Sequence, residues 1–174
     1  MSKHRFVYKK DDFLSKGECI DLINTLKKEV KVQEDSTLGY ESIDIESTPV
    51  FESLAKKLLL PLKRYGEIFP ESYYTTDPWG LTQMRFKTFR AGKSFANWHS
   101  EHGVEYSLRV LNIMIYLSDH NCGTQFYNGE VIKSVAGRLV IFPSYFTHAH
   151  KGQPCPDNKT RYLLTGYVNF LREI

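Results

Sequence analysis

Cysteine is scarce in this chain, and the few cysteines are widely spaced. Three occur among 174 residues, and none belongs to a Cys-x-x-Cys pair. An odd number of cysteines does not make a disulfide framework in a chain of this size. Reduced thiols, as in a cytosolic protein, are therefore the expected state of Cys19, Cys122 and Cys155.

Long apolar runs and a large excess of one charge are also missing. No run approaches the roughly 20 apolar residues of a membrane-spanning helix, and residues 1–10 lack the apolar core of a signal peptide. The formal net charge is only +3. Short basic clusters such as Lys56-Lys57 are typical of solvated faces rather than of a nucleic-acid-binding surface. We expect a cytoplasmic protein, in a host cell or a virus-infected cell, with neither membrane nor nucleic acid as partner.

The length fits one domain that buries about two-thirds or more of its unfolded surface. We expect residues 1–174 to form a single domain, because no convincing linker, repeat or low-complexity tract interrupts the chain. Its helical N-terminal part covers about residues 1–70, and its strand-rich part covers about residues 81–170.

Two helices are predicted in the first part. Residues 15–18 have the Ser-x-x-Glu form of a capping box, and apolar residues follow at helical spacing, namely Ile20, Ile23, Leu26 and Val30. Thr48-Pro49 indicates a second helix with an N-cap threonine and a proline at its first position. Its apolar stripe consists of Phe51, Leu54, Leu58, Leu62 and Tyr65, and stripes of this kind usually pack in a core.

After a loop at residues 73–79 the pattern changes to strands. Alternating or β-branched apolar runs predict strands at residues 81–89, 107–117, 124–127, 131–135, 138–142 and 160–170. Asn128-Gly129 between two of these runs is a strong hairpin signal. Helices followed by many short strands predict an α+β fold, in which a β-sandwich or barrel is buttressed by helices.

The candidate chemistry lies in the strand-rich part, which holds five of the six histidines. Alternate side chains of an extended segment point the same way, so His99 and Glu101 can reach one ion. Two imidazoles and one carboxylate form the facial triad of non-haem Fe(II) oxygenases. The third ligand must come from a distant strand, where His150 and, two residues earlier, His148 are the candidates.

A lone arginine gives the second part of the site. Arg161 begins an apolar strand, and a buried arginine needs an anionic partner. A guanidinium binds a carboxylate through two parallel hydrogen bonds. 2-Oxoglutarate offers a distal carboxylate to that group, while its keto acid end can chelate the metal. The competing interpretation of Arg161 is a surface charge paired across strands.

These residues occur in an order that resembles the prolyl 4-hydroxylase-like branch of the 2-oxoglutarate/Fe(II) dioxygenases. The resemblance covers about residues 81–170. It rests on Phe89-Arg90-Ala91-Gly92, His99-Ser100-Glu101, Tyr116-Leu117, Gly123-Thr124-Gln125-Phe126, Phe142-Pro143-Ser144, His150 with Pro154, and Arg161. It implies a double-stranded β-helix (jelly-roll) core with iron at its open end, buttressed by the N-terminal helices.

The resemblance also implies a role for each site residue. His99, Glu101 and His150 would be the iron ligands, and Arg161 would bind the C5 carboxylate of 2-oxoglutarate. Hydrogen bonds to the cosubstrate would come from Tyr116 and Thr165. His150 is preferred to His148 because the spacing His-x-x-x-Pro, followed by Arg about ten residues later, fits the family. Glu101 stands where the family usually has Asp.

Other residues are expected around the cosubstrate. Asn112, Tyr167 and Trp98 would line the substrate side of the pocket, and the loops at residues 34–47 and 73–79 would form its rim. His102 and His120 are expected to be loop residues without a ligand role.

The activity implied by the resemblance is hydroxylation of an unactivated C–H bond, with release of succinate and CO2. It requires Fe(II), 2-oxoglutarate and O2, with ascorbate as reductant. A peptidyl proline is the substrate implied at family level, and another protein residue or a small molecule would also suit the chemistry. One alternative is a cupin-like metal-binding jelly-roll protein that uses Glu101, His148 and His150 without 2-oxoglutarate. Another is a non-catalytic protein that keeps the fold but not the turnover.

Overall fold

The computed structural model describes residues 5–29, 34–35, 40–75 and 77–171. Two long helices, α1 (Lys16–Glu29) and α2 (Pro49–Ile68), precede most of the strands, and short 3-10 helices occur at η1 (Pro70–Tyr73) and η2 (Phe146–His148). The strands are β1 (Tyr8–Lys10), β2 (Glu34–Asp35), β3 (Tyr40–Asp44), β4 (Trp79–Phe89), β5 (Arg109–Tyr116), β6 (Gly123–Phe126), β7 (Val131–Lys133), β8 (Leu139–Pro143), β9 (His150–Gly152) and β10 (Arg161–Phe170).

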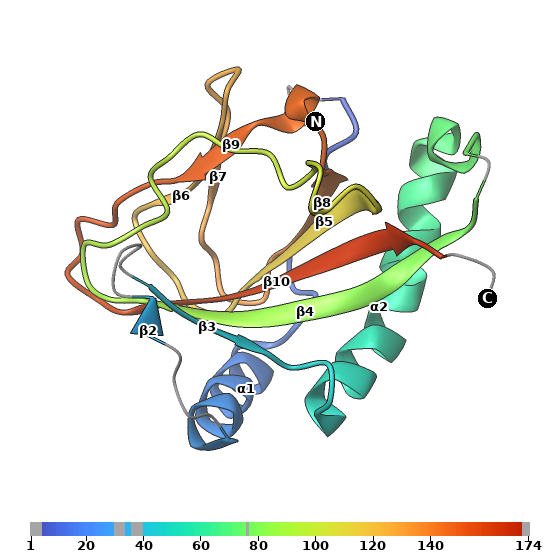
Figure 1. Cartoon of the computed structure of the whole chain (residues 1–174). Helices are drawn as coiled ribbons and strands as arrows, with labels where there is room; N and C mark the ends of the chain where they lie inside the picture. The colour runs from blue at the N-terminus through green and yellow to red at the C-terminus, as the bar shows by residue number, and fades with distance from the viewer. Residues whose placement is uncertain (1–4, 30–33, 36–39, 76, 172–174) are drawn as a thin grey trace.

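The strands form two antiparallel sheets. The larger has the order β1-β8-β5-β10-β4-β3-β2, and the smaller has the order β7-β6-β9. Figure 1 shows α1 and α2 on one side of the large sheet and the small sheet on the other side. This arrangement is the predicted α+β fold, a double-stranded β-helix core buttressed by N-terminal helices, and the prediction is confirmed.

The six predicted strands are all present, with small shifts at their ends. The hairpin predicted at Asn128-Gly129 joins β6 to β7, and Gly129 adopts a φ of 90°, which glycine reaches without steric cost. The sequence patterns missed β1, β2, β3 and β9. These strands are short, and β1 and β2 lie at the edges of the large sheet, so little apolar alternation distinguishes them from loops.

The capping box of α1 is confirmed, but its buried face differs from the prediction. The backbone N of Ser15 donates to Glu18 Oε2 at 2.8 Å, and the backbone N of Glu18 donates to Ser15 Oγ at 3.2 Å. Cys19 and Leu26 are buried, whereas Ile20 is 58% exposed. The packed face runs through Cys19, one residue before Ile20, which turns Ile20 toward solvent. The predicted stripe member Val30 lies outside the described residues.

Helix α2 begins as predicted, because Thr48 Oγ1 accepts a hydrogen bond from the backbone N of Phe51 at 3.3 Å and Pro49 takes the first turn. Its buried side chains are Leu54, Leu58, Pro61, Leu62 and Tyr65. They share one apolar cluster with residues of the large sheet. No described helix is both long and apolar enough to cross a membrane.

Helix α2 offers a matched pair for testing this packing. Leu58 is 0% exposed and its neighbour Leu59 is 68% exposed. We expect Leu58→Ala to lower the free energy of unfolding by about 2–5 kcal/mol, because it leaves a cavity against the sheet. Leu59→Ala should change it by no more than about 0.5 kcal/mol. Urea unfolding followed by circular dichroism compares the two, and equal effects would contradict this placement of α2.

A second apolar cluster lies between the two sheets. It contains Tyr116, Phe126 and Phe142, each 0% exposed, together with Met114 and Leu163. The aromatic rings fill the space beside the candidate site, since Phe126 and Phe142 both lie within ring-contact distance of His150. One wall of the site is therefore buried and largely apolar.

Candidate active site

The structure brings His99, Glu101 and His150 together at the open end of the two sheets. Their candidate ligand atoms all lie within 4.8 Å of one another. His99 and His150 exchange backbone hydrogen bonds in an antiparallel bridge, at 3.0 and 2.9 Å. The Nε2 atom of His99 lies 3.5 Å from Glu101 Oε1. Residues about fifty positions apart in the sequence therefore share one small volume.

Both imidazoles are oriented by backbone carbonyls. His99 Nδ1 lies 2.9 Å from the carbonyl oxygen of Asn97, and His150 Nδ1 lies 3.0 Å from that of His148. A carbonyl oxygen can only accept, so each Nδ1 donates to its carbonyl and each Nε2 is the ring atom left for a metal ion. Hydrogen bonds of this kind fix the ring orientation of metal-binding histidines.

The charge states also suit a metal. Burial raises the pKa of Glu101, but the His99 hydrogen bond and the charge of Lys87 lower it to about 2 overall. Arg109 Nη1 donates to Glu101 Oε2 at 3.1 Å. Burial lowers the pKa of His150 to about 4, so this ring is neutral at pH 7. An ionised carboxylate and a neutral imidazole are the forms that bind metal ions.

The same cavity, of about 300 Å³, contains Arg161 and Thr165. Arg161 is 4% exposed; its Nη1 donates to Gln153 O at 3.4 Å and to Cys122 Sγ at 3.3 Å. Arg161 Nε and Thr165 Oγ1 are buried without a hydrogen-bond partner in the part of the chain that the structure describes. Burial lowers the pKa of Arg161. A buried cation beside orphaned polar atoms indicates a place for an anionic ligand.

Tyr116 lies next to Leu163 on the cavity wall. Its hydroxyl donates to Thr124 Oγ1 at 2.7 Å. Burial raises the pKa of Tyr116, so the phenol is neutral. The hydroxyl proton of Tyr116 points to Thr124, so the hydroxyl oxygen retains a lone pair. A ligand or a water molecule can donate a hydrogen bond to that lone pair.

His148 lies outside the cluster of His99, Glu101 and His150. Its Nε2 donates to Arg5 O at 2.9 Å, and its Nδ1 lies 2.9 Å from Thr147 Oγ1. The two-residue spacing to His150 would place both rings on one face of a strand. The chain instead forms the 3-10 turn η2 at residues 146–148, which directs His148 away from the cavity.

Three other predictions for the pocket have different outcomes. Asn112 and Tyr167 line the cavity as predicted. Trp98 does not line it: this side chain is 42% exposed, packs edge-on against Tyr127 and lies under Lys151 Nζ. From the predicted rim at residues 34–47, Tyr40 lines the cavity, while residues 36–39 lie outside the described part.

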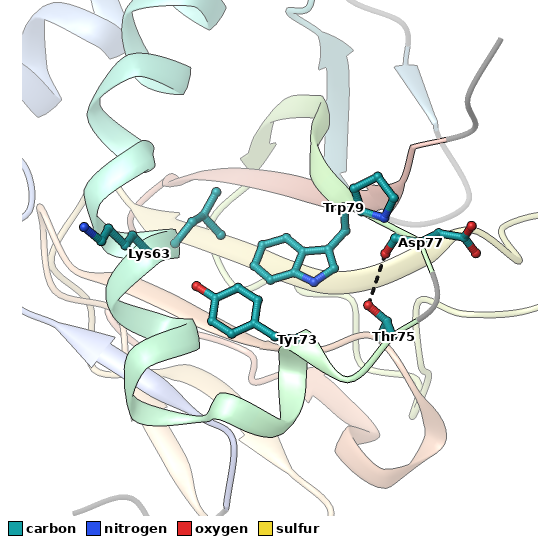
Figure 2. A pocket seen from close by; sticks show the side chains of 7 residues that line it. Lys63, Tyr73, Thr75, Asp77 and Trp79 are labelled. Carbon is teal, nitrogen blue, oxygen red and sulfur yellow. Dashed lines mark hydrogen bonds between the residues drawn. The ribbon is translucent and has the colours of Figure 1, made fainter.

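The predicted rim at residues 73–79 is wrong. These residues border a separate hollow of about 390 Å³ between α2 and the start of β4. Figure 2 shows Lys63, Tyr73 and Trp79 facing this hollow, and the last two rings stack with centroids 5.9 Å apart. The loop lies here because it connects the end of α2 to the start of β4.

The expectation of three reduced thiols is also wrong. The structure joins Cys122 and Cys155 in a disulfide across 33 residues of sequence, while Cys19 is free and buried. Strands β6 and β9 pair antiparallel, so the residue before β6 meets the loop after β9. Sequence spacing does not show this contact, because it depends on the pairing of two short strands.

His120 lies in a loop, as predicted, but it is buried and paired. Its Nδ1 lies 2.9 Å from Asp157 Oδ2, and its Nε2 lies 2.9 Å from Ser118 Oγ. Ligand atoms of His120, Asp157 and Cys155 lie within 4.8 Å of one another. The sulfur of Cys155 is held in the disulfide, so this group connects the loops behind Arg161 rather than presenting three open ligands.

The disulfide gives a stability prediction. Replacing both Cys122 and Cys155 by Ser should lower the free energy of unfolding by roughly 3–4 kcal/mol, because the unfolded chain regains the entropy of a loop of this length. Guanidinium unfolding without reductant measures the difference. Dithiothreitol should destabilise the native chain by a similar amount and leave the double variant unchanged. A native chain insensitive to reductant would contradict the cross-link.

Three cationic residues of the cavity were not anticipated from the sequence: Arg85 and Lys87 on β4, and Arg109 at the start of β5. The alternation of polar residues along β4 is visible in the sequence. It does not reveal whether the polar face meets solvent or the inside of a jelly roll.

The fold is a jelly roll, and its cavity contains two histidines and one carboxylate that could hold a metal ion. Residues 84–169, about half of the chain, match the model of a family described as the 2OG-Fe(II) oxygenase superfamily. No curated protein matches the sequence.

Solved structures share the fold at low sequence identity. A prolyl-4-hydroxylase from Pseudomonas putida has a TM-score of 0.73 at 16% identity, covering 95% of this chain and 93% of that one. The viral collagen prolyl hydroxylase of Paramecium Bursaria Chlorella virus-1, in a 2-oxoglutarate complex, has a TM-score of 0.71 at 16% identity, and the match covers 97% of each chain. HygX from Streptomyces hygroscopicus, with nickel and 2-oxoglutarate bound, has a TM-score of 0.72 at 10% identity, and the match covers 94% of this chain and 82% of that one.

The chain belongs to the 2OG-Fe(II) oxygenase superfamily and is a 2-oxoglutarate-dependent dioxygenase. It shares its fold with prolyl hydroxylases. The family uses Fe(II), 2-oxoglutarate and O2. This membership favours the oxygenase interpretation over a non-catalytic or cupin-like jelly-roll protein.

Proposed function

We propose that this chain hydroxylates an unactivated C–H bond of its substrate and releases succinate and CO2. His99, Glu101 and His150 hold Fe(II), Arg161 binds the C5 carboxylate of 2-oxoglutarate, and ascorbate keeps the iron reduced. Residues 1–174 act as one catalytic domain. The observation that supports this most strongly is the convergence, in a single cavity, of three metal-type ligands and one buried arginine that has no carboxylate partner among the described residues.

The residues present fit the metal. Two imidazoles, whose Nδ1 atoms are held by backbone carbonyls, and one ionised carboxylate are the donor set that non-haem Fe(II) oxygenases use. When bound, the iron and its chelating 2-oxo acid supply the activation of O2. Arg109 holds one carboxylate oxygen of Glu101, which leaves Oε1, the oxygen near His99, for the metal.

The residues also fit the cosubstrate. Arg161 can donate from Nε, which is unpartnered, to a carboxylate oxygen, and Thr165 Oγ1 can complete the contact. The hydroxyl oxygen of Tyr116 lies on the same wall. Phe126 and Phe142 keep water away from the neighbouring ligand His150. With its carboxylate ionised and bound on both sides, Glu101 serves as a ligand and not as a proton acceptor.

The substrate assigned at family level is a peptidyl proline. Two of the similar structures are named prolyl hydroxylases, which supports this choice by analogy of fold. HygX shows that the same fold also occurs with 2-oxoglutarate in a protein that binds hygromycin B. Small molecules therefore remain in the substrate search beside peptides.

Turnover of 2-oxoglutarate to succinate tests the proposal. The native chain is incubated with Fe(II), ascorbate and 2-oxoglutarate under air, with and without a panel of proline-containing peptides. We expect succinate in every Fe(II) sample, and a rise with any true substrate together with a product heavier by one oxygen atom. Succinate formation that does not depend on Fe(II), or its absence in all samples, would contradict the assignment.

A further inference from the structure

The cavity of the metal cluster is strongly cationic. Besides Arg161, the cations Arg85, Lys87 and Arg109 line it. Arg85 and Lys87 are alternate residues of β4, so both side chains point to the same face of the large sheet. Arg109 is the first residue of β5.

Arg109 is buried and only partly paired. It is 2% exposed, and its Cζ atom lies 3.8 Å from the ring centre of Tyr106 and 3.6 Å from that of Tyr167. Nη1 donates to the carboxylate and the backbone oxygen of Glu101, at 3.1 and 3.3 Å. Nε and Nη2 have no hydrogen-bond partner among the described residues. Buried guanidinium donors left in this state are costly, so they indicate an acceptor supplied by a ligand.

Lys87 has no hydrogen bond or ion pair in the described part of the chain, and its Nζ lies 5.3 Å from the centre of the Tyr40 ring. Burial lowers the pKa of Lys87; Glu101 raises it, and Arg85 and Arg109 lower it again. These charges act on Lys87 because they face the same cavity. The ammonium group is therefore surrounded by more positive than negative charge.

The charges of the loaded site do not cancel. Three carboxylates act on the four cations of the cavity: Glu101, which lines it, Asp44, which pairs with Arg85 at 2.7 Å, and Asp157, whose charge acts on Arg161. A metal dication and the 2-oxoglutarate dianion cancel each other. The site with metal and cosubstrate bound thus keeps one net positive charge. A neutral substrate would leave Lys87 without an ion-pair partner, and Arg109 Nε and Nη2 without an acceptor, among the described residues, which is unfavourable.

We propose that the substrate carries a carboxylate close to the carbon that is hydroxylated, and that Lys87 and Arg109 bind this carboxylate. The inference rests on the proposed function of the same site. Asn112 Oδ1, 2% exposed and unpartnered among the described residues, lies on the same wall and can accept an N–H. A substrate with a carboxylate and an N–H donor satisfies both groups. The carboxylate can belong to a free amino acid or to an acidic residue of a peptide.

The experiment uses matched acid and neutral probes on the full chain loaded with Mn²⁺ and 2-oxoglutarate. Free amino acids are compared with their amides, for example L-proline with L-prolinamide. Blocked peptides with Asp-Pro are compared with the same peptides carrying Asn-Pro. Binding is followed by the shift in melting temperature and by calorimetry, and turnover is followed by succinate release with Fe(II).

We expect at least one acid to bind about tenfold or more tightly than its neutral partner. Lys87→Met should reduce this preference to about threefold or less and raise KM for the acid more than it lowers kcat. Lys87→Arg should keep the preference, and Lys63→Met, on the exposed face of α2, serves as the surface control. Whether the amino acids or the peptides show the effect identifies the source of the carboxylate.

Equal binding of acids and neutral partners, or no binding of any acid, would overturn the inference. An acid preference unchanged in Lys87→Met would also overturn it. Mn²⁺-dependent binding of 2-oxoglutarate to the native chain is measured first in the same samples. Its absence would refute the proposed function itself, whereas its presence without an acid preference would refute only the substrate class.

Discussion

The His150→Ala variant is expected to lose metal binding and nearly all activity. His150 supplies a neutral imidazole whose Nδ1 is held by the carbonyl of His148, and it lies within 4.8 Å of the other two candidate ligands. Loss of outer partners of a metal site costs about 10–100-fold in affinity, so loss of a ligand should cost more than about 100-fold. Calorimetric titration with Mn²⁺ and succinate release with Fe(II) measure the two effects.

His148→Ala is the matched control, because it removes a histidine only two positions away. Its ring bonds to Arg5 O and Thr147 Oγ1 instead of facing the cavity. We expect this variant to be less stable by about 1–3 kcal/mol, since it removes a buried, hydrogen-bonded side chain. It should still bind Mn²⁺ with nearly native affinity. Metal binding that is lost in His148→Ala and kept in His150→Ala would show that the distal ligand is misassigned.

The second large effect is expected for Arg161→Met, which should weaken 2-oxoglutarate binding by roughly 30- to 5,000-fold. Removing one partner of a buried, hydrogen-bonded charge pair costs about 2–5 kcal/mol. Mn²⁺ affinity should stay within about threefold of native, because Arg161 is not among the three clustered ligand residues. Calorimetry of the Mn²⁺-loaded protein with 2-oxoglutarate gives both affinities.

Two further variants complete this test. Arg161→Lys retains the charge but not the planar pair of donors, so its affinity should lie between those of native and Arg161→Met. Arg64→Met removes an arginine that is exposed on α2 and pairs with Glu67, and it should bind 2-oxoglutarate like the native chain. If Arg161→Met also binds like the native chain, the cosubstrate carboxylate is bound elsewhere.

Much of the fold could be predicted because its signals are local. The N-cap at Thr48, the capping box at Ser15 and the hairpin glycine Gly129 depend on neighbours a few residues away. The strands with long apolar runs were predicted for the same reason. The short strand β9 could not be predicted, since its three residues become a strand only by pairing with β6.

The candidate site, too, could be predicted only in part. His99 and Glu101 were found from the two-residue alternation of an extended chain, and His150 and Arg161 from their order along the sequence. The direction of the His148 side chain could not be predicted, because it depends on a 3-10 turn that no strong sequence signal marks. The Cys122–Cys155 disulfide and the inward direction of Lys87 depend on contacts between distant strands, so spacing alone could not show them.

The metal site and the cosubstrate site are tested most directly by an anaerobic calorimetric titration of 2-oxoglutarate into the native chain, with and without Mn²⁺, beside His99→Ala. We expect tight binding to the native chain only when Mn²⁺ is present, and none of this metal-dependent gain in His99→Ala. Binding of equal affinity with and without metal, or a full metal-dependent gain in His99→Ala, would contradict the claim that His99, Glu101 and His150 hold the ion that 2-oxoglutarate chelates.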